Sequence, residues 1–187
     1  MLGLLKHTFT DRGANLWKKL YTSYVRPHLE FAVPVWNPHR REDIRALEGV
    51  QHRATKIPQS MKCHDYEKRC ELFGLTTLEV RRARGDMIQH FKFEKSIEEV
   101  NWVSAPHRIP ARGINREKLS CESIKNRSER RNFYTNRVVD HWNQLPNQVI
   151  ESASVNQFKS TLDEFIKNNN SVFCKNQSMY LDILYSD

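Results

Sequence analysis

The positions of apolar residues predict a chain built mainly from amphipathic helices. Over residues 11–26 an apolar or aromatic side chain recurs at four-residue steps, at Leu16, Leu20 and Tyr24, which places all three on one side of a helix. Thr10 is the expected N-cap, because its hydroxyl can accept a hydrogen bond from an amide of the first turn. A first helix is therefore expected here.

Prolines divide the stretch that follows. Pro27 is expected to end or kink the first helix, since proline has no amide proton to donate, and residues 25–31 continue as a second helical piece. Pro34 and Pro38 then place residues 35–37 in a loop.

A helix over about residues 40–56 has two distinct faces on a helical wheel. The mainly apolar face consists of Ile44, Leu47, Val50, Gln51 and Ala54. The other face gathers basic side chains, with Glu48 beside them: Arg41, Arg45, His52 and Lys56. The acids Glu42 and Asp43 fall in its first turn, where the helix dipole favours negative charge.

The next helical signals are a short helix over residues 65–73, ended by Gly74, and a longer helix opened by Thr76 and Glu79 as a capping box. The longer helix has an apolar stripe formed by Val80, Ala83, Met87, Ile88 and Phe91. Its opposite face carries Arg81, Arg82, Gln89 and Lys92, with Gly85 between them. A glycine within a cationic ridge would let a phosphate backbone approach closely; the alternative is a solvated face with a helix-weakening glycine.

Periodicity fades between residues 96 and 132, where prolines and a glycine interrupt it. We expect a loop with a strand or two, or a segment ordered only by its ligand. Helical spacing returns at residues 134–145 and ends at Pro146, and Ser154 with Gln157 forms a second capping box before an apolar stripe over 155–166.

The expected fold is therefore mainly α. It comprises a helical bundle over 1–97, which the resemblance described below makes thumb-like, a basic irregular segment over 98–132, a small C-terminal helical region over 133–167 and a disordered tail over 168–187.

Charge narrows the class of partner. Lysine and arginine total 30 against 22 acids, for a net charge of +8, and residues 108–137 alone carry nine basic and three acidic side chains. Such an excess raises the prior for a polyanion partner, most often nucleic acid; the alternative is a solvated basic surface, and charge alone does not separate the two. The mean hydropathy is −0.72, and the notable apolar run over 31–36 is six residues long and contains Pro34, so no membrane segment is expected. Residues 1–5 lack the basic region of a signal peptide, so we expect an intracellular protein, nuclear or cytoplasmic and not secreted.

Known catalytic and metal-binding patterns are missing from the sequence. The four cysteines form no C-x-x-C pair, which favours free thiols over a zinc site or a disulfide framework. There is no phosphate-binding glycine loop, nucleophile elbow or H-E-x-x-H motif, and no Asp-Asp pair of the kind that polymerases use to hold two metal ions. We therefore expect no catalytic residue, no metal site and no cofactor in this chain.

Several runs in order resemble the region after the catalytic palm of reverse transcriptases from non-LTR (LINE-type, jockey-like) retrotransposons. The most specific is LWKKLYTSYVRPHLEFAVPVWNP over residues 16–38, and it is followed by LEGVQHRATK over 47–56 and LFGLTTLEVRRARGD over 72–86. FYTNRVVDHWNQLP over 133–146 and SVNQFK over 154–159 are similar to the closing motifs of those polyproteins. With LGLLK at 2–6, the resemblance covers residues 1–167.

The resemblance implies a thumb and the region downstream of it. In that family the preceding fingers and palm carry the aspartates that bind Mg²⁺, so this chain would be a truncated part without them, and the missing palm is a possible partner. A 5′-truncated insertion with Met1 as an internal start and 168–187 beyond the old stop would account for the chain's extent.

A thumb grips the template–primer duplex by its backbone, and the downstream region of that family is thought to hold element RNA or target DNA. The candidate nucleic-acid-binding residues are Arg41, Arg45, Lys56, Arg81, Arg82, Lys92, Arg112, Arg116, Arg127, Arg130 and Arg131.

Three hypotheses follow from these observations. The leading one is a non-catalytic C-terminal fragment of an RNA-directed DNA polymerase that binds an RNA/DNA duplex or element RNA without sequence preference. The second is a domesticated protein-interaction module whose surface includes aromatic residues that once faced the palm: Trp17, Tyr24, Phe31 and Trp36. The third is an unproductive transposon remnant.

Overall fold

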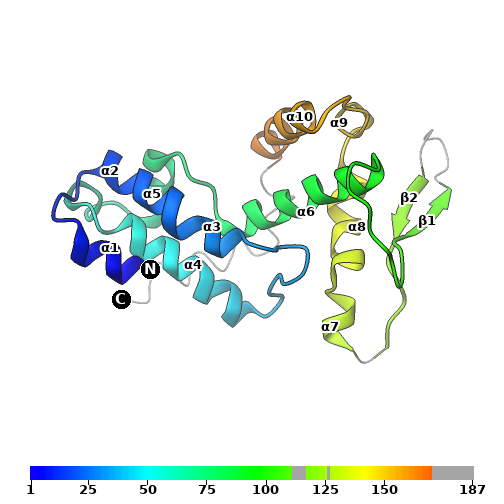
Figure 1. The fold of residues 1–187 in the computed structure, drawn as a ribbon, viewed down its shortest axis with the longest axis horizontal. Helices are drawn as coiled ribbons and strands as arrows, with labels where there is room; N and C mark the ends of the chain where they lie inside the picture. The colour runs from blue at the N-terminus through cyan, green and yellow to red at the C-terminus, as the bar shows by residue number, and fades with distance from the viewer. Residues whose placement is uncertain (111–116, 126, 170–187) are drawn as a thin grey trace. The chain divides into compact units, whose positions relative to one another are not determined.

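The computed structural model describes residues 1–110, 117–125 and 127–169, and Figure 1 shows its ribbon. The chain is mainly helical, as the apolar spacing predicted. Its longer elements are α1 (Leu2–Thr8), α2 (Ala14–Leu20), α3 (Arg26–Glu30), α4 (Arg41–Thr55), α5 (Tyr66–Phe73), α6 (Leu78–Glu94), α8 (Tyr134–Gln144) and α10 (Val155–Asn168). Shorter pieces are η2 (Gln59–Met61), α7 (Ser128–Arg131) and α9 (Asn147–Ile150). Two strands, β1 (His107–Pro110) and β2 (Glu117–Ser120), pair antiparallel with Arg108 opposite Leu119.

Packing divides the described residues into two compact units. Unit 1 comprises Met1–Ala32 and Pro38–Arg81, and unit 2 comprises Val33–Asn37 and the described residues from Arg82 onward. The division runs within α6, and residues 33–37 pack with parts of the chain that follow much later. The two units are therefore not two consecutive stretches of the sequence.

The first helix starts later than the sequence indicated and runs without a break into the second helical piece. It begins at Ala14 with Gly13 as N-cap, so Thr10 is not its cap, and α1 before it was not predicted. A π-helical turn over Tyr21–Val25 joins α2 directly to α3, with the amide of Arg26 bonded to the carbonyl of Tyr21. The wider turn immediately precedes Pro27, which cannot donate to the carbonyl four residues earlier. The helical piece after Pro27 is thus confirmed.

The caps of the later helices follow from short polar side chains. Asp65 accepts the amide of Lys68 at the start of α5, and Gly74 ends that helix in the left-handed conformation at φ 59°. Ser154 Oγ accepts the amide of Gln157 at the start of α10, and Gln157 Oε1 accepts the amide of Ala153. These ends lie where the sequence predicted them.

The start of α6 differs from the predicted capping box. Thr77 Oγ1, one residue beyond Thr76, lies 3.4 Å from the amide of Val80, and the amide of Leu78 donates to the carboxylate of Glu48 on α4 at 2.9 Å. A side chain from another helix therefore caps α6, a contact that local sequence spacing does not reveal.

Each unit buries an aromatic core. In unit 1, Trp17 and Tyr66 are almost fully buried, and Trp17 Nε1 donates to the carbonyl of Ala54 at 2.8 Å. In unit 2, the rings of Phe91 and Phe158 stack at 4.2 Å between centroids. The apolar stripes predicted for α6 and α10 supply these two rings.

Candidate nucleic-acid interface

The predicted cationic face of α4 is interrupted in the middle. Arg41 and Lys56 are exposed at its two ends and Arg45 is half-buried, but Glu48 on the same face is only 1% exposed. Residues at these spacings share one side of a helix, so burial at Glu48 shows that the centre of this face packs against the protein. The exposed cations of this face, Arg41 and Lys56, therefore lie at the two ends of α4, with a buried acid between them.

Glu48 is buried because it belongs to a polar cluster inside unit 1. Its carboxylate accepts hydrogen bonds from the hydroxyl of Tyr66 and the amide of Leu78. Gln51 joins the cluster by donating to the Tyr66 oxygen at 2.9 Å and accepting from the Tyr21 hydroxyl at 2.8 Å. The wheel projection placed Gln51 with the apolar residues, and that side chain is indeed buried, but as a hydrogen-bonding residue.

Arg81 holds two helices of unit 1 together. Its guanidinium donates to both carboxylate oxygens of Glu30 at the end of α3, with 2.9 Å between Nη2 and Oε2. Arg26 lies 3.5 Å from the same carboxylate. Arg81 is half-buried. Glu30 neutralises its charge only in part, because the same carboxylate also lies close to Arg26.

Arg82 is a buried structural residue, which corrects its assignment to a phosphate-binding face. Its side chain is 2% exposed, its guanidinium carbon lies 4.1 Å from the centre of the Trp36 ring, and it donates to Asn37 Oδ1 at 2.7 Å and to the Trp36 carbonyl at 2.6 Å. Such stacking and bonding satisfy a buried cation.

Gly85 does not open a path for a phosphate backbone either. A Cβ atom built at Gly85 would lie 3.9 Å from the Cβ of Val33, an ordinary packing distance. The segment Val33–Asn37 therefore packs against this side of α6, within unit 2. Sequence periodicity identified the side of the helix but could not show that a loop lies over it.

Lys92 faces solvent only in part. Its ammonium group lies 2.6 Å from Glu98 Oε1, and Gln89 donates to the other oxygen of the same carboxylate. The hydrogen bond from Lys92 is the main cause that lowers the pKa of Glu98. Lys92 is thus ion-paired, as are Arg81 with Glu30 and Arg84, one turn after Arg81 on α6, with Asp163 on α10.

The cations around α7 present a different picture. Arg127 and Arg131 are exposed, and their side chains form no ion pair with any residue in the described part of the chain. Arg130 pairs with Glu122, at 2.8 Å from Nη2 to Oε2. Arg112 and Arg116 lie outside the described residues. Among the candidates of unit 2, Arg127 and Arg131 are the ones available to an anionic ligand.

Two asparagines on α8 fix the backbone beside these cations, and the sequence analysis did not single them out. Asn136 accepts the amide of Glu122 at 2.8 Å and donates to the carbonyl of Arg130 at 3.2 Å. Asn143 brackets Leu119 in β2, accepting its amide at 3.0 Å and donating to its carbonyl at 2.8 Å. Their seven-residue spacing, which puts both on one side of a helix, was the signal available.

The aromatic surface expected for a protein-interaction module is reduced. Trp17 belongs to the core of unit 1, and the ring of Trp36 lies against Arg82. Tyr24, Phe31 and Trp36 remain exposed, at 54%, 72% and 41%. The prediction that Trp17 belongs to such a surface is therefore wrong.

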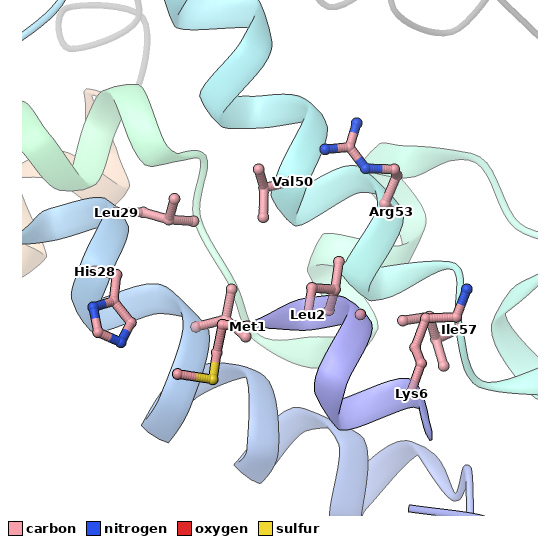
Figure 2. A pocket seen from close by; sticks show the side chains of 10 residues that line it. Met1, Leu2, Lys6, His28, Leu29, Val50, Arg53 and Ile57 are labelled. Atoms are coloured by element: carbon pink, nitrogen blue, oxygen red, sulfur yellow. The ribbon is translucent and has the colours of Figure 1, made fainter. Parts of the chain in front are cut away.

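A pocket in unit 1 lies between α1, α3 and α4 (Figure 2). Its volume is about 540 Å³, and its walls include the apolar side chains of Met1, Leu29 and Val50. The charged or titratable groups that line it are those of Lys6, His28 and Arg53. The lining thus combines apolar and basic groups.

Comparison with protein-family models, with curated proteins and with solved structures returns no match to this chain. Across residues 1–110, 117–125 and 127–169, no helix is long and apolar enough to cross a membrane. In the same residues no cluster of three or more His, Cys, Asp or Glu side chains is placed to hold a metal ion. Cys63 and Cys121 are exposed free thiols, and Cys70 is a buried one whose pKa burial raises to about 11.

Proposed function

We propose that this chain is a non-catalytic nucleic-acid-binding part of a non-LTR retrotransposon reverse transcriptase, comprising its thumb and the region downstream. It binds RNA or an RNA/DNA duplex through phosphate contacts without sequence preference. The observation that carries the proposal is the pair of exposed arginines at α7, Arg127 and Arg131, which make no ion pair in the described residues.

The physical basis is the electrostatics of a polyanion. Each arginine that meets a phosphate releases condensed counterions, so a small number of contacts gives measurable and strongly salt-dependent affinity. Arginine also offers donors that match phosphate oxygens in pairs. The basic excess over residues 108–137 and the net charge of +8 raise the local concentration of such a ligand.

The proposal assigns different roles to the other candidates. Arg41 and Lys56 on α4 are exposed and can meet phosphate in unit 1. Arg81 and Lys92 are ion-paired with Glu30 and Glu98, and Arg82 is buried, so these three stabilise the fold. In the proposed parent enzyme, catalysis and Mg²⁺ binding would belong to the palm, and this chain would hold the nucleic acid.

The test replaces both exposed arginines, as Arg127→Gln with Arg131→Gln, and measures the affinity of the full chain for an RNA–DNA hybrid over a range of salt concentrations. Each lost phosphate contact reduces the salt slope by about one, so the double variant is expected to bind more weakly with a slope smaller by about two. The loss should be the same for hybrids of different sequence.

The matched control removes two positive charges elsewhere in unit 2, as Lys159→Gln with Lys167→Gln on α10. This control should retain the wild-type slope to within a fraction of one contact. Equal losses in the two double variants would show that only net charge matters and would contradict a site at α7. Salt-insensitive binding to a specific protein, with none to the hybrid, would instead favour the interaction module.

A further inference from the structure

An exposed aromatic ring lies among the cations at α7. Phe133 is 42% exposed, although phenylalanine has no polar atom to solvate, and it is the N-cap residue of α8. It follows α7 after one intervening residue, so its ring and the exposed arginines belong to one short stretch of surface. Isolated exposed apolar residues are ordinary, and the surroundings of this ring decide whether it has a role.

Arg130 lies over the ring in a fixed position. Its guanidinium carbon is 5.7 Å from the centre of the Phe133 ring, within the range of a cation–π contact. Nε and Nη2 of the same group both bond to Glu122 Oε2, at 3.1 and 2.8 Å. Glu122 thereby orients the guanidinium over one face of the ring, and Phe133 still remains 42% exposed.

The backbone under this surface is held from α8. Asn136 is 5% exposed, and its amide bonds to both the Glu122 amide and the Arg130 carbonyl. The amide of Phe133 in turn donates to the carbonyl of Arg130 at 3.2 Å. The ring and guanidinium therefore sit on a braced turn, which lowers the entropy lost when a ligand stacks on them.

The surrounding charge is positive. Lys125, Arg127 and Arg131 are exposed on the same stretch, together with one exposed acid, Glu129, whereas the carboxylate of Glu122 is engaged by Arg130. Aromatic rings next to cations suit a ligand that has both flat apolar faces and negative charge. Nucleotides combine these features, and stacking on aromatic side chains with phosphate contacts alongside is how single strands are bound.

We propose that Phe133 and Arg130 form a stacking platform for an unpaired base, so that the α7 site binds single-stranded nucleic acid, with Arg127 and Arg131 on its phosphates. This inference rests on the proposed function and specifies the ligand at that site. A base inside a duplex is already covered on both faces by its neighbours and has no face to offer the ring. A strand that stacks on the platform is therefore unpaired, whether it is RNA or DNA, whereas a duplex would meet only the arginines of the site.

The experiment measures the binding of full-length Phe133→Ala to labelled oligouridylate, to the same oligomer with abasic central positions, and to an RNA–DNA hybrid. Loss of one stacked base is expected to weaken oligouridylate binding by about tenfold or more. Binding to the abasic oligomer and to the hybrid should change less than about twofold, because these ligands offer the ring no free base. Phe133→Trp should restore binding, since tryptophan retains an aromatic face. A matching deoxyribose oligomer separates RNA from DNA preference.

The matched control is Phe31→Ala, which removes an exposed phenylalanine from unit 1 and should leave oligouridylate binding unchanged. Wild-type affinity of Phe133→Ala for oligouridylate, or an equal loss for the abasic oligomer, would overturn the platform. If Phe133→Ala loses its fold, it will bind all three ligands more weakly. The test then rests on Phe133→Trp, which keeps an aromatic face and should bind oligouridylate as the wild type does. Absence of salt-dependent binding by the wild-type chain to any of the ligands would instead refute the proposed function.

Discussion

Glu48 is the residue whose environment most affects the chemistry of unit 1. Its carboxyl group is 1% exposed, and burial raises its pKa from 4.5 to about 7, although the hydrogen bonds from Tyr66 and the Leu78 amide favour the ionised form. Burial also raises the pKa of the Tyr66 hydroxyl, and the nearby charge of Glu48 raises it further. Protonation of Glu48 is therefore linked to the stability of the packing between α4, α5 and α6.

Replacement of this residue, as Glu48→Gln, should remove part of the pH dependence of stability. The folded-state pKa lies above that of the unfolded chain, so the folded protein binds a proton that the unfolded chain releases, and wild-type stability falls as pH rises through about 7. The expected fall in the free energy of unfolding between pH 5 and pH 8 is on the order of 1–3 kcal/mol.

Urea unfolding at both pH values measures this difference. Glu48→Gln should show a smaller fall than the wild type, and Glu42→Gln, an exposed acid on the same helix, should show an unchanged one. The same pH dependence in wild type and Glu48→Gln would show that the Glu48 carboxyl does not titrate in this range.

At the level of single residues, the sequence indicated side-chain type and helix face but not burial by distant segments. It identified Arg81, Arg82 and Lys92 as cations on one side of a helix. It could not show that Trp36 and Asn37 receive Arg82, because those residues precede it by about forty-five positions along the chain. Arg127 and Arg131 were expected in an irregular segment; both are exposed, but Arg127 is the N-cap residue of the short helix α7 and Arg131 is its last residue.

At the level of elements, α6 and α8 are joined inside unit 2 by a buried ion pair. Arg137 bonds to both oxygens of Asp86, at 2.7 and 2.9 Å, and also donates to the carbonyl of Val33 at 2.6 Å. Asp86 is 3% exposed. Removal of one member leaves the other charge buried without its partner, which is far more destabilising than loss of a surface pair.

Asp86→Asn should therefore lower the free energy of unfolding by about 3–5 kcal/mol. The control is Asp163→Asn, which breaks the more exposed pair between Arg84 and α10 and should lower it by about 1 kcal/mol or less. Thermal or urea unfolding of both variants at one pH gives the comparison. Equal losses would contradict the view that the Asp86–Arg137 pair, and not charge pairing in general, ties α6 to α8.

The predicted helices were recovered where an apolar period and a local cap coincide, as in α5 and α10, and α4 was recovered from its period alone. The beginning of α2 was not predicted, because its N-cap residue, Gly13, is a weak sequence signal for a helix start. The cap of α6 was not predicted, because Glu48 reaches it from another helix. The antiparallel pair of β1 and β2 fits the expected strand or two, but its register depends on contacts such as those of Asn143 with Leu119.

At the level of the whole molecule, the chain carries a net charge of +8 on two compact units. Ion pairing neutralises much of the basic surface of α6, so in the described residues the charge available for a polyanion lies on exposed arginines elsewhere, among them Arg127 and Arg131 at α7 and Arg41 on α4. Composition raised the prior for a polyanion partner, and the distribution of ion pairs changes which residues are proposed to meet it.

The central claim is that this chain binds nucleic acid mainly through phosphate contacts. The measurement that tests it most directly is the affinity of the full-length protein for an RNA–DNA hybrid as a function of salt concentration. If two or more phosphates are engaged, log affinity should fall linearly with log salt, with a slope of about −2 or steeper. Absence of binding at low salt, or affinity with a slope near zero, would contradict the account.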